Sequence, residues 1–291
     1  MTKIVFFGTE KESSLVLEKL ISNNFDISLV VTKPDSVKGR GQKIYQPDVK
    51  KLALKHNIAV SQPNNLKELV LPKNSSVGVL VSFGKIIPQS IIDSFKYGII
   101  NIHPSLLPQY RGPSPIETAI LNGDDETGVS LISLSSKMDA GPIFAQEKIS
   151  LSDQEYKSEL YKVLFELGSK LLIKNLDKIV SEKLEPTPQN NSLATYCHLF
   201  KKTDGNLDSN NMSAIECERK VRAFIGFPKT NINFSGKKII VTKAKSLYNF
   251  SGDNWPDIIK CKNNSFLQIE EIISPTSGKT MKVTDYLRGL R

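Results

Sequence analysis

The sequence predicts an α/β protein in which a Rossmann-like domain with a parallel β-sheet precedes a small β-barrel domain. Two features predict the first domain: short apolar runs alternate with amphipathic stretches, and these runs are apolar almost without interruption. Such runs are typical of parallel strands whose two faces are both covered by helices. A third feature predicts the barrel, because short strand-like pieces separated by turn residues occupy the end of the chain.

The elements of the first domain follow one another as strands separated by helices. A buried strand is expected at residues 3–8 (KIVFFG), and a helix at 12–21, where leucine and isoleucine recur at helical spacing. Further expected elements are strands at 27–32, 77–82, 98–102 and 129–134, a helix at 47–56, and an extended segment at 143–149. A long helix at 155–180 ends the domain.

The second domain follows a segment that is rich in Pro, Gly, Asn and Asp. Residues 185–191 (EPTPQNN) and 203–211 (TDGNLDSNN) have the composition of a linker. A helix at 213–223 and strands at 238–244 and 266–273 are expected after it. We therefore predict a first domain at residues 1–184, a linker at 185–204 and a second domain at 205–291.

Composition and charge limit the classes of function. Hydrophobic residues make up 39% and charged residues 24% of the chain, as in ordinary globular proteins. The net charge is +9, and residues 201–291 carry 16 basic against 9 acidic side chains, so most of the excess lies in the second domain. This favours a polyanionic partner such as nucleic acid, and a solvated lysine-rich surface is the competing interpretation.

Several cofactor and compartment classes are not expected. Cys197, Cys217 and Cys261 are odd in number and lack metal-type spacing, which indicates reduced thiols in a cytosolic protein and no metal. No apolar run approaches the ~20 residues of a membrane span, and no export signal precedes the first strand. NAD is not expected, because the first turn (residues 8–13, GTEKES) has one glycine where a dinucleotide fingerprint has three.

Asn101 and His103 are the first candidate catalytic residues. They are two positions apart at the end of an apolar strand, so both side chains lie on the same face. Pro104 holds the histidine in extended backbone at the carboxyl end of the strand, where open α/β sheets bind ligands. An amide and an imidazole aimed at one point suit a carbonyl that becomes an oxyanion, but a polar pair at a strand end is also possible.

Asp139 is the third candidate and lies in a Gly/Pro turn at residues 136–142. A carboxylate that meets His103 would favour the imidazolium and orient it for acid–base chemistry. The two residues are 36 positions apart, so spacing does not decide whether they meet. An isolated loop aspartate is usually a turn residue, and both interpretations stay open at this point.

The block at residues 101–112 (NIHPSLLPQYRG), followed by Pro115, Ile116 and the Asp-Ala-Gly at 139–141, resembles the signature of the folate-dependent formyltransferase family. The resemblance implies that N10-formyltetrahydrofolate is the formyl donor, that Asn101, His103 and Asp139 are the catalytic set, and that no covalent enzyme intermediate forms. It also implies folate contacts in the segments that border these residues and in the loop that receives the pterin ring. The implied folate-binding residues are Ser105, Leu106, Leu107, Pro108, Phe83, Gly84, Ile86, Ile87 and Met138.

Along nearly its whole length the chain is similar to those family members that formylate methionine on initiator tRNA for translation initiation. In them, an insertion matching residues 33–43 contacts the tRNA acceptor arm, and an OB-like barrel forms the second domain. The resemblance thus implies initiator methionyl-tRNA as a partner, with no obligate protein partner. The implied tRNA-binding residues are Lys38, Arg40, Lys43 and Arg222. Glycine-spaced cations suit phosphate contact, and a solvated loop is the plainer alternative.

The sequence departs from the family in its second domain. A Pro-Trp-Pro is common there, whereas this chain reads Gly226-Phe227-Pro228, and a second common tryptophan after the linker is missing. These changes concern the packing of the second domain rather than the chemistry. Two other functions compete with this one: a formyltransferase for a small amine such as an amino sugar nucleotide, and a non-catalytic nucleic-acid-binding protein. The loop at 33–43 and the basic C-terminal third of the chain argue against the first, and the intact Asn/His/Asp set argues against the second.

Overall fold

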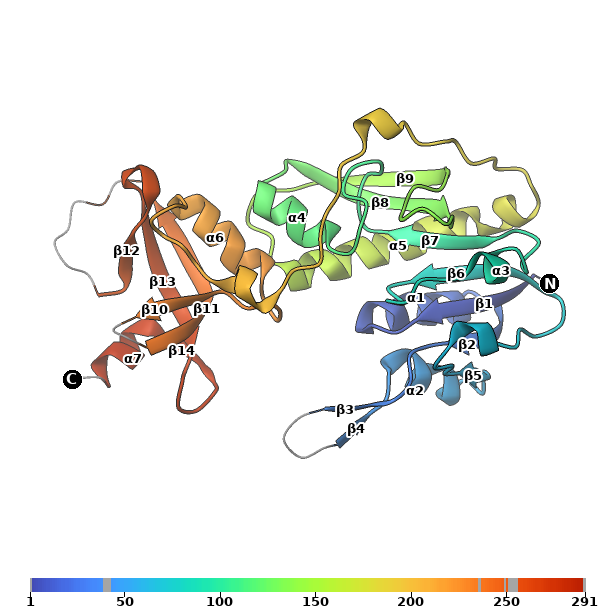
Figure 1. Cartoon of the computed structure of the whole chain (residues 1–291), viewed down its shortest axis with the longest axis horizontal. Coiled ribbons are helices and arrows are strands. Elements are labelled where there is room, and N and C mark those ends of the chain that lie inside the picture. The colour runs from blue at the N-terminus through green and yellow to red at the C-terminus, as the bar shows by residue number, and fades with distance from the viewer. Residues whose placement is uncertain (1, 39–42, 235–236, 249, 251–255, 290–291) are drawn as a thin grey trace. The chain divides into compact units, whose positions relative to one another are not determined.

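The structure, a computed structural model, describes residues 2–38, 43–234, 237–248, 250 and 256–289 (Figure 1). Contacts between residues divide the chain into two compact units. The first unit comprises Met1–Gly112, Thr127–Ile149 and Tyr161–Tyr196, and the second comprises Pro113–Glu126, Ser150–Leu160 and Cys197–Arg291. The predicted fold class, a parallel-sheet α/β domain followed by a barrel-like β domain, is confirmed.

A seven-stranded sheet forms the first unit, in the order β5-β2-β1-β6-β7-β8-β9. Neighbouring strands from β5 to β7 are parallel, whereas β8 runs antiparallel to β7. The expected parallel sheet is therefore extended by an antiparallel strand next to β7. The bounds of the strands are β1 Lys3–Gly8, β2 Asp26–Val31, β5 Val60–Ser61, β6 Ser75–Val81, β7 Ile99–His103, β8 Glu126–Ser133 and β9 Ile143–Ser150.

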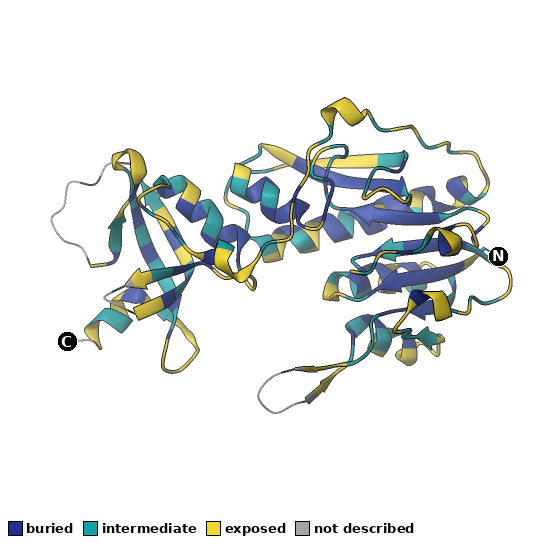
Figure 2. Ribbon diagram, in the orientation of Figure 1, coloured by how far each residue is buried: buried dark blue, intermediate teal, exposed yellow. Residues whose placement is uncertain are grey.

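The apolar runs of the sequence are the buried strands of this sheet (Figure 2). Every residue of β7 is buried, because helices and neighbouring strands cover it. Phe7 of β1 packs edge-to-face on Phe83 and Phe95, with ring centroids 5.7 and 6.2 Å away. The helices of this part of the chain are α1 Lys11–Ser22, α2 Asp48–Lys55, α3 Gln89–Ile92 and α5 Lys157–Val180, the last of which begins in the second unit.

The segment expected as a loop at residues 33–43 forms a short hairpin. Strands β3 (Ser36–Lys38) and β4 (Lys43–Tyr45) pair antiparallel, with Val37 opposite Ile44. Val37 and Ile44 are exposed by 62% and 73%, so the hairpin buries little apolar surface of its own. Backbone pairing between β3 and β4, rather than a hydrophobic core, thus holds these two strands together.

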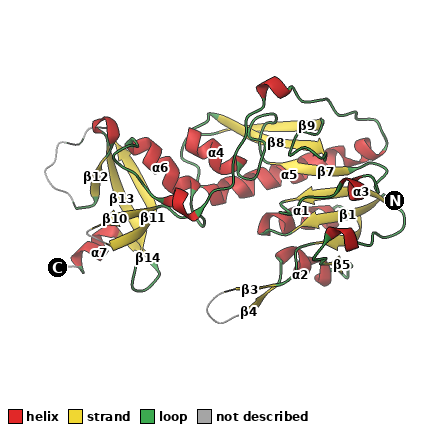
Figure 3. Cartoon of the chain, viewed as in Figure 1, coloured by secondary structure: helices red, strands yellow, loops and turns green. Residues whose placement is uncertain are grey.

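The second unit is built around an antiparallel half-barrel (Figure 3). Its strands run in the order β10-β11-β13-β12, and β14 also pairs with β13. Helix α6 (Ala214–Ala223) packs on the sheet through Cys217 and Val221, and a capping box of Ser213 and Glu216 starts the helix. The other elements of this unit are α4 Pro115–Asn122, β10 Asn231–Phe234, β11 Lys237–Leu247, β12 Ile258–Lys260, β13 Phe266–Ile273, β14 Thr280–Lys282 and α7 Val283–Arg288.

Across the described residues, none of the helices combines the length and the apolar composition that crossing a membrane requires.

Candidate active site

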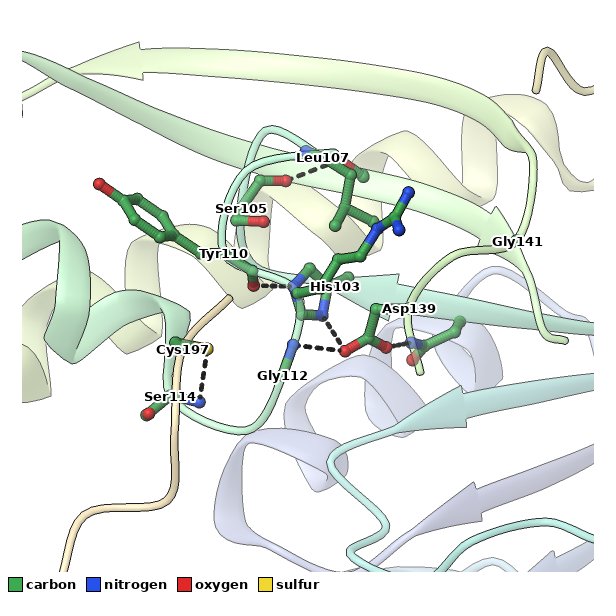
Figure 4. Close-up of polar contacts among 12 residues, drawn as sticks. His103, Ser105, Leu107, Tyr110, Gly112, Ser114, Asp139, Gly141 and Cys197 are labelled. Carbon is green, nitrogen blue, oxygen red and sulfur yellow. Dashed lines mark hydrogen bonds and ion pairs between the residues drawn. The ribbon is translucent and has the colours of Figure 1, made fainter. Parts of the chain in front are cut away.

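The polar residues of β7 lie at the point where this buried strand ends (Figure 4). His103 is the last residue of β7, and Asn101 precedes it on the same face of the strand. Both are buried, with exposed fractions of 6% for Asn101 and 4% for His103. Buried polar side chains need hydrogen-bond partners, so their contacts define the site.

His103 is held at both ring nitrogens. Its Nε2 lies 3.0 Å from the backbone carbonyl oxygen of Tyr110. A carbonyl oxygen only accepts hydrogen bonds, so Nε2 carries a hydrogen and donates it. The other nitrogen, Nδ1, faces the Asp139 carboxylate with Oδ2 3.7 Å away, a distance too long for a full hydrogen bond.

Asp139 meets three groups from β7 and the loop after it. Its Oδ1 accepts a hydrogen bond from Asn101 Nδ2 at 3.4 Å, and its Oδ2 accepts one from the Gly112 backbone N–H at 2.9 Å. The same Oδ2 faces His103 Nδ1. The Asp139 backbone has φ 48°, a left-handed conformation that few non-glycine residues adopt. The loop therefore holds this side chain in a fixed place against the strand end.

Amide, imidazole and carboxylate thus converge from two segments that are far apart in sequence. The carboxylate supplies a negative charge and hydrogen-bond acceptors, while the amide and the imidazole supply donors. This combination can stabilise an oxygen that gains negative charge and can accept a proton from an attacking amine. The contact between His103 and Asp139, which sequence spacing left open, is present in the structure.

The segment after His103 is fixed by a network of hydrogen bonds. The Ser130 hydroxyl of β8 donates to the Ser105 carbonyl at 2.6 Å and accepts from the Leu107 backbone N–H at 3.0 Å. The Ser105 hydroxyl donates to the Gln109 carbonyl at 2.6 Å. Ser105 and Leu107 are buried, whereas Leu106 and Pro108 are partly exposed. Among these four expected folate contacts, only Leu106 and Pro108 have side chains with open surface.

The expected pterin loop divides into core and surface residues. Phe83 and Ile87 belong to the hydrophobic core, so their side chains face the protein interior. Gly84 is exposed with φ 68°, and Ile86 is 87% exposed. Met138, next to the catalytic aspartate, is 61% exposed. A flat ring can therefore reach Ile86, Met138 and the backbone of this loop. Phe83 and Ile87 instead anchor the loop in the hydrophobic core.

The expected tRNA-binding residues lie in different settings. Arg40 and the side chains of Lys38 and Lys43 lie outside the described part of the chain. Arg222 is 2% exposed, and its guanidinium pairs with Asp153 at 2.7 Å. The expectation of a phosphate contact at Arg222 does not agree with this position. Its side chain instead connects α6 to the segment before α5, because buried arginine needs an anionic partner.

Sequence reasoning missed three residues that surround the catalytic set. Tyr110 supplies the carbonyl that binds His103, and Gly112 supplies the N–H that binds Asp139. Both are in the motif at 101–112, but they act through backbone atoms, whose direction a residue type does not reveal. Gln189 donates to the Asp139 and Gly141 carbonyls at 2.8 and 2.7 Å, and it comes from the linker, where no motif marked it.

Within the described residues, no group of three or more His, Cys, Asp and Glu side chains is arranged to hold a metal ion.

An amide–imidazole–carboxylate set at the carboxyl end of a sheet strand has the donors and the acceptor that group transfer at a carbonyl carbon uses. Comparison with known proteins identifies the transferred group as a formyl group. Residues 2–176 match the family model described as formyl transferase, and residues 200–291 match that of the formyl transferase C-terminal domain. A methionyl-tRNA formyltransferase of Staphylococcus epidermidis is 34% identical over 100% of this chain and 97% of its own. One of Sulfurihydrogenibium sp. is 38% identical over 84% of this chain and 80% of its own.

The chain therefore belongs to the formyl transferase family, and within it to the methionyl-tRNA formyltransferases. Solved structures share the fold at lower identity. An N-formyltransferase from Helicobacter canadensis, in complex with folinic acid and dTDP-3-aminofucose, has a TM-score of 0.71 at 22% identity and covers 92% of this chain and 99% of its own. HypX from Aquifex aeolicus in complex with tetrahydrofolic acid has a TM-score of 0.67 at 17% identity, covering 98% of this chain and 46% of its own.

Proposed function

We propose that this enzyme transfers the formyl group of 10-formyltetrahydrofolate to the α-amino group of methionine on initiator tRNA. The observation that carries the proposal is the cluster of Asn101, His103 and Asp139 at the end of β7. Full-length similarity to methionyl-tRNA formyltransferases supports the choice of acceptor. The three cysteines are free thiols, which fits a cytoplasmic enzyme.

Bound folate would supply a formyl carbon that an amine can attack. Asn101 Nδ2 has two hydrogens, of which one points to Asp139. The second is available to the formyl oxygen, whose negative charge grows as the amine attacks. The His103 ring lies beside Asn101 on the same strand face, held by the Tyr110 carbonyl at Nε2 and by the Asp139 carboxylate at Nδ1. A preorganised donor such as Asn101 typically contributes ~10²–10³ in rate.

Asp139 has two tasks in this mechanism. It orients the His103 ring, and it accepts the proton that the amine loses, directly or through a water molecule. The bond between the formyl carbon and the folate nitrogen then breaks, and that nitrogen leaves after taking up a proton, so that tetrahydrofolate is released. Its side chain is 15% exposed, so one edge of the carboxylate is open to solvent and substrate. The Gly112 N–H fixes the carboxylate throughout, since this bond does not involve the reacting groups.

The residues around the cluster fit a folate. The exposed Ile86 and Met138 offer apolar contact to a flat ring. The missing side chain of Gly84 makes room for Lys33, whose Nζ would lie 2.4 Å from a Cβ at this position. Phe83 and Ile87 hold the loop in place from the core. Leu106 and Pro108 border the catalytic histidine, and Ser105 and Leu107 fix that segment through Ser130.

The decisive experiment compares acceptors. Purified protein with 10-formyltetrahydrofolate is given methionyl initiator tRNA, free methionine or a nucleotide-linked amino sugar, and the formylated products are separated and counted. We expect formyl-methionyl-tRNA as the main product. Formylation of the amino sugar without formylation of the tRNA would contradict the proposed acceptor but leave formyl transfer intact.

Strands β3 and β4, together with the residues between them in sequence, are the proposed tRNA contact of the first unit. Replacing Arg40 by alanine should raise the KM for methionyl-tRNA several-fold and leave the KM for folate unchanged, because a phosphate contact acts on one substrate only. The steady-state KM values for both substrates measure this. A matching rise in both would show that the arm does not contact tRNA specifically.

A further inference from the structure

The linker segment at residues 187–196, named here the strap, lies in the first unit and contacts both loops of the active site. It contains no strand, only the short helical turn Asn191–Leu193, which Figure 1 shows in gold. The two loops are the histidine loop, residues 107–112, and the aspartate loop, residues 137–142. Contacts between the strap and these loops explain how the catalytic groups keep their positions.

Backbone hydrogen bonds attach the strap to the histidine loop. The Arg111 N–H donates to the Thr195 carbonyl at 2.9 Å, and the Thr195 N–H donates to the Pro108 carbonyl at 3.2 Å. The Tyr110 N–H donates to the Thr195 hydroxyl at 2.9 Å. Tyr110 lies between these bonds and supplies the carbonyl that fixes His103. The strap thereby holds the peptide that orients the imidazole.

Gln189 of the strap joins the two loops through its side-chain amide. Its Nε2 donates to the Asp139 and Gly141 carbonyls at 2.8 and 2.7 Å. Its Oε1 accepts from Arg111 Nε and Nη2 at 3.1 and 2.8 Å. The amide can have only this orientation, because carbonyls accept and a guanidinium donates. The Gln189 side chain thus binds the aspartate loop, which carries Asp139, and it also binds Arg111. Arg111 precedes Gly112, whose N–H holds the Asp139 carboxylate.

Both loops need such support because their backbones are strained. Asp139 has φ 48° and Tyr110 has φ 57°. Both values lie in the left-handed region, which is unfavourable for residues other than glycine. Arg111 is 3% exposed, and its guanidinium also binds Asn191 Oδ1 at 2.8 Å. A buried guanidinium without these acceptors would be costly, so the strap and the histidine loop stabilise each other.

We propose that Gln189 is a positioning residue for formyl transfer: it holds the Asp139 carboxylate at the distance from His103 and Asn101 that the reaction needs. The inference rests on the proposed function, because it names the same site. It assigns a catalytic influence to a linker residue that touches no reacting group. Displacement of a catalytic group by about 1 Å can lower a rate roughly hundredfold, so loss of the amide should act on kcat rather than on binding.

The test compares Gln189→Leu with Leu193→Ala, a control in the same strap whose side chain is 63% exposed. Single-turnover and steady-state rates of methionyl-tRNA formylation are measured for both. We expect Gln189→Leu to lower kcat roughly ten- to hundredfold and to change each KM by less than about twofold, since substrates do not touch the amide. Leu193→Ala should match the wild type. Equal kcat values for the two variants would overturn the inference.

A second variant separates positioning from folding. Gln189→Glu keeps an oxygen acceptor for Arg111 but offers no N–H to the Asp139 and Gly141 carbonyls. Its kcat should fall at least as far as that of Gln189→Leu, because a carboxylate oxygen then faces the same two carbonyl oxygens, and thermal unfolding checks that the variant is folded at the assay temperature. Wild-type kcat in a folded Gln189→Glu would overturn the inference.

A double-mutant cycle identifies the group through which Gln189 acts. With asparagine at position 139 the carboxylate is already lost, so adding Gln189→Leu should lower kcat by less than about twofold. A full ten- to hundredfold further loss would show that Gln189 acts elsewhere, and the inference would be wrong. Failure of the wild type itself to formylate methionyl-tRNA would instead contradict the proposed function, which keeps the two failures distinct.

Discussion

Replacing Asp139 by asparagine removes the negative charge of the site and one of its two acceptor oxygens. The amide has nearly the size of the carboxylate, and its oxygen can still accept from the Gly112 N–H, which donates at 2.9 Å in the wild type. Its NH2 group then takes the place of Oδ1, which accepts from Asn101 Nδ2 at 3.4 Å, so a donor faces a donor there. His103 Nδ1, 3.7 Å from the carboxylate, loses its charged neighbour, and the amide cannot accept a proton from the attacking amine.

The size of the effect follows from the role of Asp139 as the proton acceptor. A positioned general base typically contributes about 10²–10⁴ in rate. The Asp139 side chain is only 15% exposed, so bulk water replaces it poorly, and we expect kcat to fall by roughly 10³. The KM values should change little, since Asp139 acts after the substrates are bound.

Single-turnover formation of formyl-methionyl-tRNA at saturating folate measures this loss directly. Asp93→Asn is the matched control, because that carboxylate is exposed and bonds only to Gln89 among the contacts described. It should retain the wild-type rate. If Asp139→Asn lost less than about tenfold, the carboxylate would be a structural turn residue and the proposed mechanism would be refuted.

Two further predictions concern the support of the site and the second unit. Gly141→Ala should lower kcat at least about tenfold and lower the free energy of unfolding by about 1–3 kcal/mol, because the new Cβ would lie 1.7 Å from the Ser133 carbonyl oxygen. Formylation rates and urea unfolding measure these effects, and wild-type values for both would contradict the prediction. Asp153→Asn should lower the free energy of unfolding by about 2 kcal/mol at neutral pH. Burial alone would raise the pKa of Asp153, but hydrogen bonds from Arg219 and Arg222 outweigh it and hold that pKa below its ordinary 3.8. This stabilisation is complete above pH 3.8 and is lost as the pH falls through the lower pKa that Asp153 has in the folded protein. The difference in unfolding free energy between variant and wild type, measured with urea, should therefore shrink below pH 3.8. A constant difference would show that the Asp153 charge is not the cause.

Much of the fold could be predicted because its signals are local. The apolar runs at 3–8 and 98–102 are strands β1 and β7, and the leucine spacing at 155–180 gives helix α5 within two residues of its start. The strand expected at 129–134 is β8, and only the structure shows that it runs antiparallel to β7. The direction of a strand depends on how the connecting segment crosses the sheet, and an apolar run looks the same in a parallel and in an antiparallel strand.

The site was only partly predictable for a related reason. Sequence placed Asn101 and His103 on one face of a strand, because side chains alternate along extended backbone. It also marked Asp139 through its motif. It could not place Arg222, which the family resemblance implied to be a tRNA-binding residue and which is buried against Asp153. Charge alone does not distinguish a surface arginine from one that has its counterion inside the protein.

The sequence by itself determined the elements, the catalytic residue types and the family motif, since each depends on neighbours in the chain. Only the tertiary structure decided that Asp139 meets His103, that Tyr110 and Gly112 act through their backbones, and that Gln189 ties the two loops together. The physical reason is that hydrogen bonds between distant segments depend on distances of a few ångströms and on donor direction. Both arise only when the sheet, the loops and the linker have packed.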